Sequence, residues 1–408
     1  MHAEIVVTGS ELLLGEIVDT NSTMLARMLR DIGLDLYYKT AVGDNRERVA
    51  GVLTLALQRS DIVLTSGGLG PTVDDLTREA VADATGRPLV FHQQLLDQIA
   101  ARFARFGRPM SDNNRRQAYV PEGALIVENT EGTAPAFIVE DERGTIISMP
   151  GVPRELEHLM KTHVILYLKR RLGTPAVIRP KVLRTCNIGE SQIDALIADL
   201  MTASNPTVGL AAHAGEVDVR ITAKAPTQEE ADRLIVPVEA EVRRRLGDVI
   251  FGEGAQTLEL VVCDLLVARS LTLSVVDSVT GGDVGDRLRS VPQHTVLVGD
   301  RRYADNAAAA AGLRLERVLL QEGGQRAAET AAARVREESG SALGLALLGM
   351  LAAGDDAPRA YVCLTDGATT ITRSYRFGAE NDLTRRWIAV RGLDMLRRHL
   401  MGVQPLDR

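Results

Sequence analysis

The stretch Asp61-Ile62-Val63-Leu64-Thr65-Ser66-Gly67-Gly68-Leu69-Gly70 decides the fold of the first part of the chain. Its apolar run is typical of a strand that is buried on both faces. The glycines that follow allow a tight turn, and a helix is predicted over residues 74–85. A strand that passes through a turn into a helix is the repeating unit of a parallel sheet.

Strand and helix patterns alternate outward from this stretch. Strands are predicted at 4–7, 34–42 and 146–149, and helices at 21–32, 46–57 and 154–172. We therefore expect an α/β fold, a three-layer α/β/α domain with its sheet between two helix layers. Ligands of such sheets bind beyond the carboxyl ends of the strands, where the loops 9–20 and 66–75 are predicted to lie.

The length of 408 residues is too great for one ordinary core. We expect three domains, at 1–173, 176–252 and 255–408, of which the second is a small α+β module and the third is again α/β. Gly173-Thr174-Pro175 and Gly252-Glu253-Gly254 are the expected linkers.

The amino-acid composition limits the kinds of molecule that the protein is expected to bind. A net charge of −7 argues against broad attraction to nucleic acid or anionic lipid, and 3% aromatic residues argue against a base-stacking platform. The sequence has no apolar run of the ~18 residues that a membrane span needs, and its start lacks the features of a secretory leader. Its three cysteines lack metal-type spacing. We expect a cytoplasmic protein that binds neither nucleic acid nor membrane directly.

The glycine loop is the first candidate binding element. Gly67, Gly68 and Gly70 can bring backbone N–H groups near a ligand, and the N-terminus of the following helix favours phosphate. A tight turn without a ligand is the competing interpretation. With the loops at 8–21, 132–135 and 149–153, the substrate-binding candidates are Gly9, Asn21, Ser66, Gly67, Gly68, Gly70, Thr72, Thr133, Pro150 and Gly151.

Carboxylates beside a phosphate pocket suggest a hard divalent cation. Asp74 and Asp75 are candidates both for catalysis and for binding the metal, Glu11 for catalysis and Asp19 for the metal. Because Thr72 and Asp75 have the spacing of a capping box, one aspartate could cap the helix instead. We expect Asp74 to face the site. Taken alone, Glu11 and Asp19 fit solvated or capping residues better than catalytic ones, and Asn21 could cap its helix or contact a ligand.

Together these segments resemble the N-terminal domain of the CinA (competence/damage-inducible protein A) family, and the resemblance extends across the middle, KH-like module. That N-terminal domain is similar in fold to molybdopterin-binding domains. The resemblance implies hydrolysis of ADP-ribose to AMP and ribose 5-phosphate, a divalent cation (Mg²⁺, Mn²⁺ or Co²⁺) and a homodimer. Metal and carboxylates together suit pyrophosphate hydrolysis.

The third domain resembles the nicotinamide-nucleotide amidase domain of the same family through residues 275–282. The matching positions are Ser278, Thr280, Gly281, Gly282 and, further on, Tyr303, whereas Asp277 replaces a glutamate and Val279 a cysteine. This strand, turn and helix suit a phosphate.

Two of the catalytic residues that the resemblance implies are missing from this domain. Gln293-His294-Thr295 stands where the family has its serine, and the family's glycine-rich loop is reduced over residues 348–354. Ala308 stands where the family has its lysine, and no lysine follows Lys224. A serine nucleophile needs an adjacent base, and arginine cannot serve as one. We therefore expect the domain to keep its fold and to have lost deamidase chemistry.

Two other functions remain open at this point. One is a non-catalytic module that binds a nucleotide or a molybdopterin-like ligand, since the fold serves binding as well as catalysis. The other is an interaction protein linked to competence or DNA repair, whose third domain is a dimerisation or docking surface. The Asp74-Asp75 pair beside the glycine loop favours the hydrolase over the binding module.

Overall fold

The computed structural model describes residues 1–105, 107–173, 176–315, 324–350, 359–376 and 381–404. The chain divides into two compact units, the first Met1–Arg179 with Lys224–Asp232, and the second Pro180–Ala223 with Arg233–Arg408. Both units are α/β, which confirms the predicted fold class. Within the described ranges, no helix combines the length and the apolar character that a membrane span requires.

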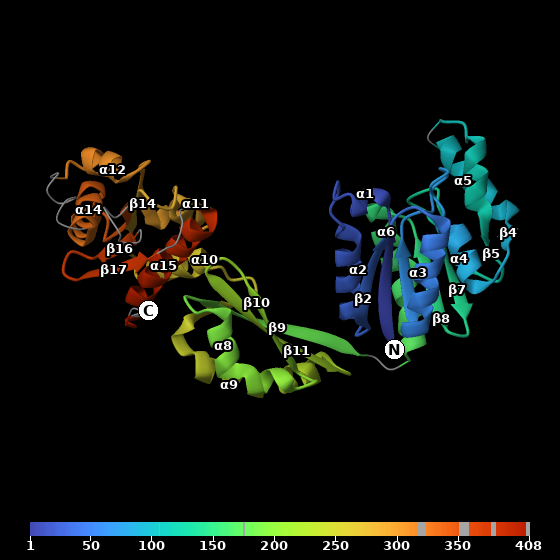
Figure 1. The fold of residues 1–408 in the computed structure, drawn as a ribbon, viewed down its shortest axis with the longest axis horizontal. Helices are drawn as coiled ribbons and strands as arrows, with labels where there is room; N and C mark the ends of the chain where they lie inside the picture. Colours follow the sequence, from blue (N-terminus) through green and yellow to red (C-terminus); the bar gives the residue numbers. More distant parts are fainter. Residues whose placement is uncertain (106, 174–175, 316–323, 351–358, 377–380, 405–408) are drawn as a thin grey trace. The chain divides into compact units, whose positions relative to one another are not determined.

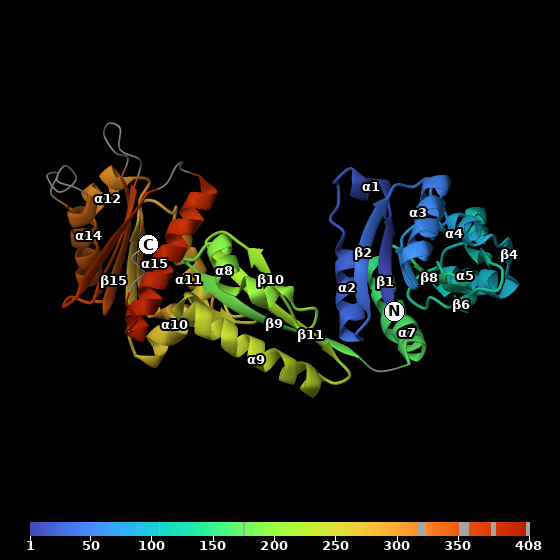
Figure 2. The ribbon, with the colours of Figure 1, turned by 60° about the horizontal axis from the view of Figure 1, so that its bottom comes forward.

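The first unit is built on a six-stranded sheet with the order β2-β1-β3-β8-β7-β6 (Figures 1 and 2). Strands β2, β1, β3 and β8 are parallel, and β7 and β6 continue the sheet in antiparallel pairing. Its strands are β1 (His2–Thr8), β2 (Asp35–Val42), β3 (Ile62–Ser66), β6 (Leu125–Val127), β7 (Ala136–Asp141) and β8 (Gly144–Met149). Its helices are α1 (Ser10–Leu13), α2 (Thr20–Asp31), α3 (Arg46–Arg59), α4 (Thr77–Thr85), α6 (Pro153–Leu159), η2 (Met160–Val164) and α7 (Ile165–Leu172).

Each face of this sheet has its own hydrophobic core. Leu25 and Leu29 of α2 and Leu156 and Leu159 of α6 pack on one face, and Leu53 of α3 packs with α4 on the other. The three layers follow from this division. Because α2 and α3 cover opposite faces, β1 and β3 border the point where the chain switches sides, and a ligand crevice is expected beyond their carboxyl ends.

Residues 89–121, for which no helix or strand was predicted from the sequence, lie beside this core. They contain β4 (Leu89–Phe91), α5 (Gln93–Arg105), η1 (Asp112–Ala118) and β5 (Tyr119–Pro121). Leu95 of α5 and Ala118 are buried in the same core as α3 and α4. This segment is therefore part of the first unit, and α5 lines a cavity described below.

The second unit contains two sheets. The predicted α+β module forms a sheet of order β10-β11-β9-β12, and the predicted third domain forms one of order β14-β13-β15-β16-β17. The elements of the α+β module are, in chain order, β9 (Val177–Cys186), α8 (Glu190–Ile197), η3 (Ala198–Thr202), β10 (Thr207–Ala212), β11 (Glu216–Ala225), α9 (Gln228–Leu246), η4 (Gly247–Val249) and β12 (Ile250–Glu253). The described elements of the third domain are α10 (Leu258–Ala268), β13 (Leu273–Asp277), α11 (Asp283–Arg289), η5 (His294–Val296), β14 (Leu297–Arg302), α12 (Asn306–Gly312), α14 (Gly324–Ser339), β15 (Leu343–Met350), β16 (Arg359–Thr365), β17 (Thr370–Arg376) and α15 (Asp382–Met401).

A buried charge cluster joins these two parts of the second unit. The carboxylate of Asp394 on α15 accepts hydrogen bonds from Arg397 Nε (2.8 Å), from Arg398 Nε (3.0 Å) and from Asn187 Nδ2 (2.6 Å), which follows β9. Arg397 also donates to the Asp248 carbonyl at 2.6 Å. Asp394, Arg397 and Arg398 are at most 2% exposed, so each buried charge depends on the others.

We predict that Asp394→Asn destabilises the second unit by about 3–5 kcal/mol, because two buried guanidinium groups lose their counter-charge. Urea unfolding followed by circular dichroism measures this difference. Asp382→Asn, on the same helix, is the control because its side chain is 94% exposed, and it should change stability little. Equal stability of the two variants would contradict the role given to Asp394.

Candidate active site at the glycine loop

Three loops of the first unit meet at Gly67. The Gly67 amide donates to the Met149 carbonyl (3.1 Å), so the ends of β3 and β8 are joined there. Gly67 has φ +107°, and a Cβ at this position would lie 2.6 Å from the Thr8 carbonyl oxygen. A Cβ at Gly151 would lie 3.2 Å from the Gly67 Cα. Only glycine therefore allows the three backbones to approach this closely.

The carbonyl groups of the glycine loop are held from the side of α4. Thr77 Oγ1 donates to the Gly67 carbonyl (2.8 Å), and the Thr77 amide donates to the Gly68 carbonyl (3.1 Å). The Arg78 guanidinium donates to the carbonyls of Leu69 (2.6 Å) and Gly70 (2.8 Å). Arg78 is 2% exposed, and burial lowers its pKa to about 10.

This arrangement fixes the direction of the loop amides. In a trans peptide the C=O and N–H bonds point in opposite directions. The N–H groups of Gly68, Leu69 and Gly70 therefore point away from Thr77 and Arg78. No described residue accepts a hydrogen bond from these three amides. Successive backbone N–H groups that point to one side form an anion-binding concavity.

A cavity of about 420 Å³ opens over this loop. Eleven of the residues predicted for the site line it. They are Gly9, Glu11, Gly67, Gly68, Gly70, Thr72, Asp74, Asp75, Thr133, Pro150 and Gly151. The sequence segments thus come together at the carboxyl end of the sheet.

The two adjacent aspartates have different surroundings. Asp75 accepts hydrogen bonds from the Thr72 amide (2.8 Å) and the Thr72 hydroxyl (2.5 Å), and its carboxylate occupies the space that a Cβ at Gly70 would need. The helix α4 begins only at Thr77, so neither aspartate caps it, contrary to the capping alternative. The pKa of Asp74 is lowered, chiefly by the adjacent Thr72 side chain and next by its own backbone amide, although the Thr72 hydroxyl itself donates to Asp75. Asp75 holds the loop, and Asp74 stays ionised beside the cavity.

Three of the predicted residues do not line the cavity. The carboxylate of Asp19 caps α2 by accepting from the Ser22 amide (2.9 Å), so the metal role predicted for it has no support in its position. Asn21 neither caps α2 nor lines the cavity, because its Nδ2 donates to Ser66 Oγ (3.0 Å) and to the Gly151 carbonyl (2.7 Å). Asn21 and Ser66 therefore hold two of the loops together.

Residues that were not predicted from the sequence also line the cavity, among them Asp44, Gln117 and Glu155. Asp44 accepts from the Ser10 amide at 2.7 Å, and Gln117 donates to the Leu69 carbonyl at 3.3 Å. Glu155, in the first turn of α6, accepts from Asn129 Nδ2 at 2.6 Å. In the sequence, Glu155 looks like any acidic residue in the first turn of a helix, and no local pattern indicates that it reaches the cavity.

The carboxylates do not form a closed metal cage. Among the described residues, no group of three His, Cys, Asp or Glu side chains is close enough together to hold an ion. The predicted cluster of Glu11, Asp19, Asp74 and Asp75 is therefore not assembled by the protein alone. Mg²⁺ is commonly held by one or two carboxylates together with phosphate oxygens of the substrate. Asp74, ionised and beside the loop amides, fits that mode of binding.

The loop after β13 in the second unit is organised differently. The buried carboxylate of Asp277 accepts from the amides of Val279 (2.9 Å), Thr280 (2.8 Å) and Gly282 (2.8 Å), and also from the Thr280 hydroxyl. The expectation that this loop suits a phosphate is therefore wrong for these amides, because the chain's own carboxylate already binds them.

The remaining positions of this second site also have structural partners. Ser278 Oγ donates to Asn306 Oδ1 at 2.5 Å, and the Tyr303 amide donates to the Asp277 carbonyl at 2.9 Å. Gly281 and Gly282 both have positive φ. Ala308 lies in the first turn of α12, where its amide is capped by Asp305. Residues 351–354 of the shortened family loop lie outside the described residues.

The three-layer fold and glycine loop of the first unit define a domain of the molybdopterin-binding class. Three family models match the chain: a probable molybdopterin binding domain over residues 4–170, the KH domain of damage-inducible protein CinA over 180–252, and the CinA C-terminal domain over 255–400. The chain belongs to the CinA family.

Two relatives match this chain over nearly its full length. The CinA-like proteins of Dictyoglomus thermophilum and Dictyoglomus turgidum are each 37% identical over 99% of this chain and their full length. The crystal structure of CinA from Thermoplasma acidophilum is 32% identical, covering 40% of this chain and 96% of its own, with a TM-score of 0.38.

We predict that Gly67→Ala destabilises the first unit by at least about 1–2 kcal/mol, the cost of a side chain at positive φ, and opens the site. Gly51→Ala is the matched control: a Cβ at Gly51, within α3, meets nothing within 4 Å, and alanine should stabilise the helix by roughly 0.5–1 kcal/mol. Thermal unfolding measures both changes. A Gly67→Ala protein as stable as the Gly51→Ala protein would contradict the close approach described here.

Proposed function

We propose that the first unit hydrolyses the pyrophosphate bond of ADP-ribose, giving AMP and ribose 5-phosphate. The observation that carries this proposal is the row of three amides, Gly68, Leu69 and Gly70, which face a cavity that also holds the Asp74 carboxylate. The amides suit a phosphate group. A carboxylate beside them suits the cation that pyrophosphate cleavage requires.

The proposed reaction uses one water molecule. Its oxygen forms a bond to one phosphorus atom while the bond from that phosphorus to the bridging oxygen breaks, and the leaving phosphate keeps the bridging oxygen. Glu11 takes the proton of the attacking water, since its carboxylate lines the cavity and accepts no hydrogen bond from a described side chain. Asp74 and the substrate phosphates would hold a divalent cation, which neutralises phosphate charge and acidifies a bound water.

We predict that Asp74→Asn lowers turnover of ADP-ribose by about 100-fold or more, as loss of an electrostatic stabiliser does. Asp75→Asn keeps an oxygen that can accept from Thr72, so it should retain most of the turnover and lose about 1 kcal/mol of stability. AMP release with Mg²⁺, Mn²⁺ or Co²⁺ is the measurement. The reverse order of the two variants would show that Asp75 is the functional carboxylate, and no release with any cation would leave a binding module.

We also propose that the second unit has lost deamidase activity. The support is chemical: its loop amides bind Asp277, and the chain has no lysine after Lys224 to act as a base. Because arginine cannot deprotonate, no nearby arginine replaces that base.

Accordingly, the purified protein should release no ammonia from nicotinamide mononucleotide above the uncatalysed rate, because the implied nucleophile and base are both absent. A coupled ammonia assay checks this. Ammonia release that Tyr303→Phe abolishes would overturn the proposal.

A further inference from the structure

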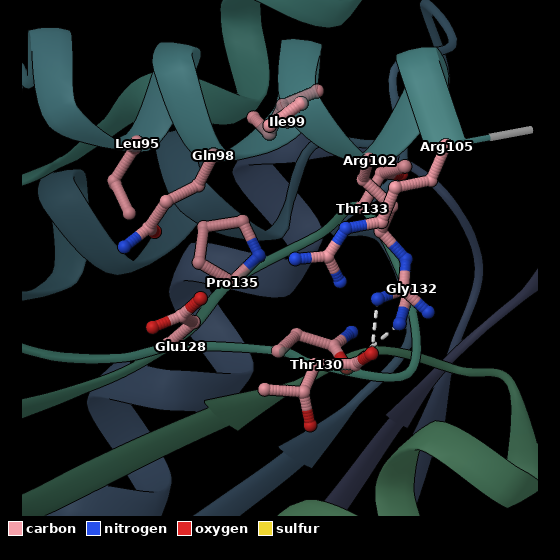
Figure 3. A pocket seen from close by; sticks show the side chains of 12 residues that line it. Leu95, Gln98, Ile99, Arg102, Arg105, Glu128, Thr130, Gly132, Thr133 and Pro135 are labelled. Carbon is pink, nitrogen blue, oxygen red and sulfur yellow. Dashed lines mark hydrogen bonds between the residues drawn. The ribbon is translucent and has the colours of Figure 1, made fainter.

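A second cavity of the first unit adjoins the glycine-loop cavity, and Thr133 lines both. It has a volume of about 200 Å³ and lies between α5 and residues 128–135 (Figure 3). We call it the arginine pocket, because Arg102 and Arg105 of α5 reach into it from one side.

The wall shared by the two cavities is held rigidly. The buried Asn129 accepts from the amides of Glu131 (3.0 Å) and Gly132 (2.9 Å) and donates to the Ala134 carbonyl (2.9 Å). A Cβ at Gly132 would lie 1.8 Å from Glu155 Oε2, so a larger residue here would force the Glu155 side chain to move. The wall is therefore a preformed surface on which a ligand can extend from one cavity into the other.

The arginine pocket carries positive charge at one end. Arg102 donates to the Thr130 carbonyl, which fixes its guanidinium near Gly132, and Figure 3 shows Arg105 reaching toward the same place. The Arg105 side chain has no hydrogen bond or ion pair with a described residue. Glu131 is paired with Arg154 and Glu155 with Asn129, while Glu128 lines the opposite end of the same pocket. The two guanidinium groups at this end of the pocket suit a phosphate, because a guanidinium can bind phosphate oxygens in bidentate fashion.

The other end of the arginine pocket has a different character. Leu95, Ile99 and Pro135 form an apolar surface there, and Gln98 and Glu128 lie beside it (Figure 3). A carboxylate and a carboxamide can accept hydrogen bonds from hydroxyl groups. A sugar ring offers both an apolar face and hydroxyl groups at its edge.

We propose that the arginine pocket binds the sugar-phosphate half of a pyrophosphate-linked nucleotide, with the phosphate on Arg102 and Arg105 and the sugar hydroxyls on Gln98 and Glu128. This assignment rests on the proposed function of the adjoining cavity. The nucleoside phosphate, the larger half, belongs in the glycine-loop cavity, which is about 420 Å³ against about 200 Å³. The bridging oxygen then lies at Thr133, the residue common to both.

The test is calorimetric titration of the full chain with ribose 5-phosphate, AMP and inorganic phosphate. We expect Arg105→Ala to weaken ribose 5-phosphate about tenfold, the effect of one charge-assisted hydrogen bond, and to leave AMP unchanged. Arg108→Ala is the matched control, since Arg108 is exposed just beyond α5 and does not line the pocket. Glu128→Gln should weaken ribose 5-phosphate and leave inorganic phosphate unchanged.

Three results would overturn the assignment: no binding of ribose 5-phosphate to the unmodified chain, equal affinity in Arg105→Ala, or an equal loss of AMP affinity in that variant. Failure of the proposed function looks different. Ribose 5-phosphate would then bind as expected, while the unmodified chain releases no AMP from ADP-ribose.

Discussion

The buried guanidinium of Arg78 donates hydrogen bonds to the carbonyls of Leu69 and Gly70 and thereby fixes the direction of their peptide groups. The site depends on this interaction. With the Thr77 bonds to Gly67 and Gly68, it commits the carbonyls to α4 and leaves the amides on the cavity side. A buried charge that loses its partners is costly, and therefore the loop has little freedom to rotate its peptide planes. Asp75 is held separately by Thr72, and Asp74 lines the same cavity as the amides.

The two units use a similar sequence pattern with opposite results. Each has a strand that runs into a glycine turn and a helix, at residues 62–70 and 273–282. In the first, side chains of the following helix hold the carbonyls, and the amides are available to a ligand. In the second, Asp277 comes from the end of the strand itself and binds the amides of Val279, Thr280 and Gly282. The amides of a glycine turn are therefore available to a ligand only if the chain supplies no acceptor of its own.

Much of the fold could be predicted because periodic patterns report burial directly. The helix expected at 21–32 is Thr20–Asp31, and the strand expected at 34–42 is Asp35–Val42. The loops of the site could be gathered at one sheet edge for the same reason. What the sequence could not show depends on tertiary contacts, above all the approach of Glu155 to the cavity. The cap by Asp19 is instead a local contact, and the sequence offered it as an alternative to the metal role. The strands that flank α5 are only three residues long and give weak sequence patterns, and Arg102 and Arg105 were not predicted.

The central claim is that the two glycine loops differ in amide availability, and amide resonances test it directly. Titration of the ¹⁵N-labelled chain with inorganic pyrophosphate should shift the N–H signals of Gly68, Leu69 and Gly70. Those of Val279, Thr280 and Gly282, already bonded to Asp277, should not move. Shifts confined to the second set, or shared equally by both sets, would contradict the account.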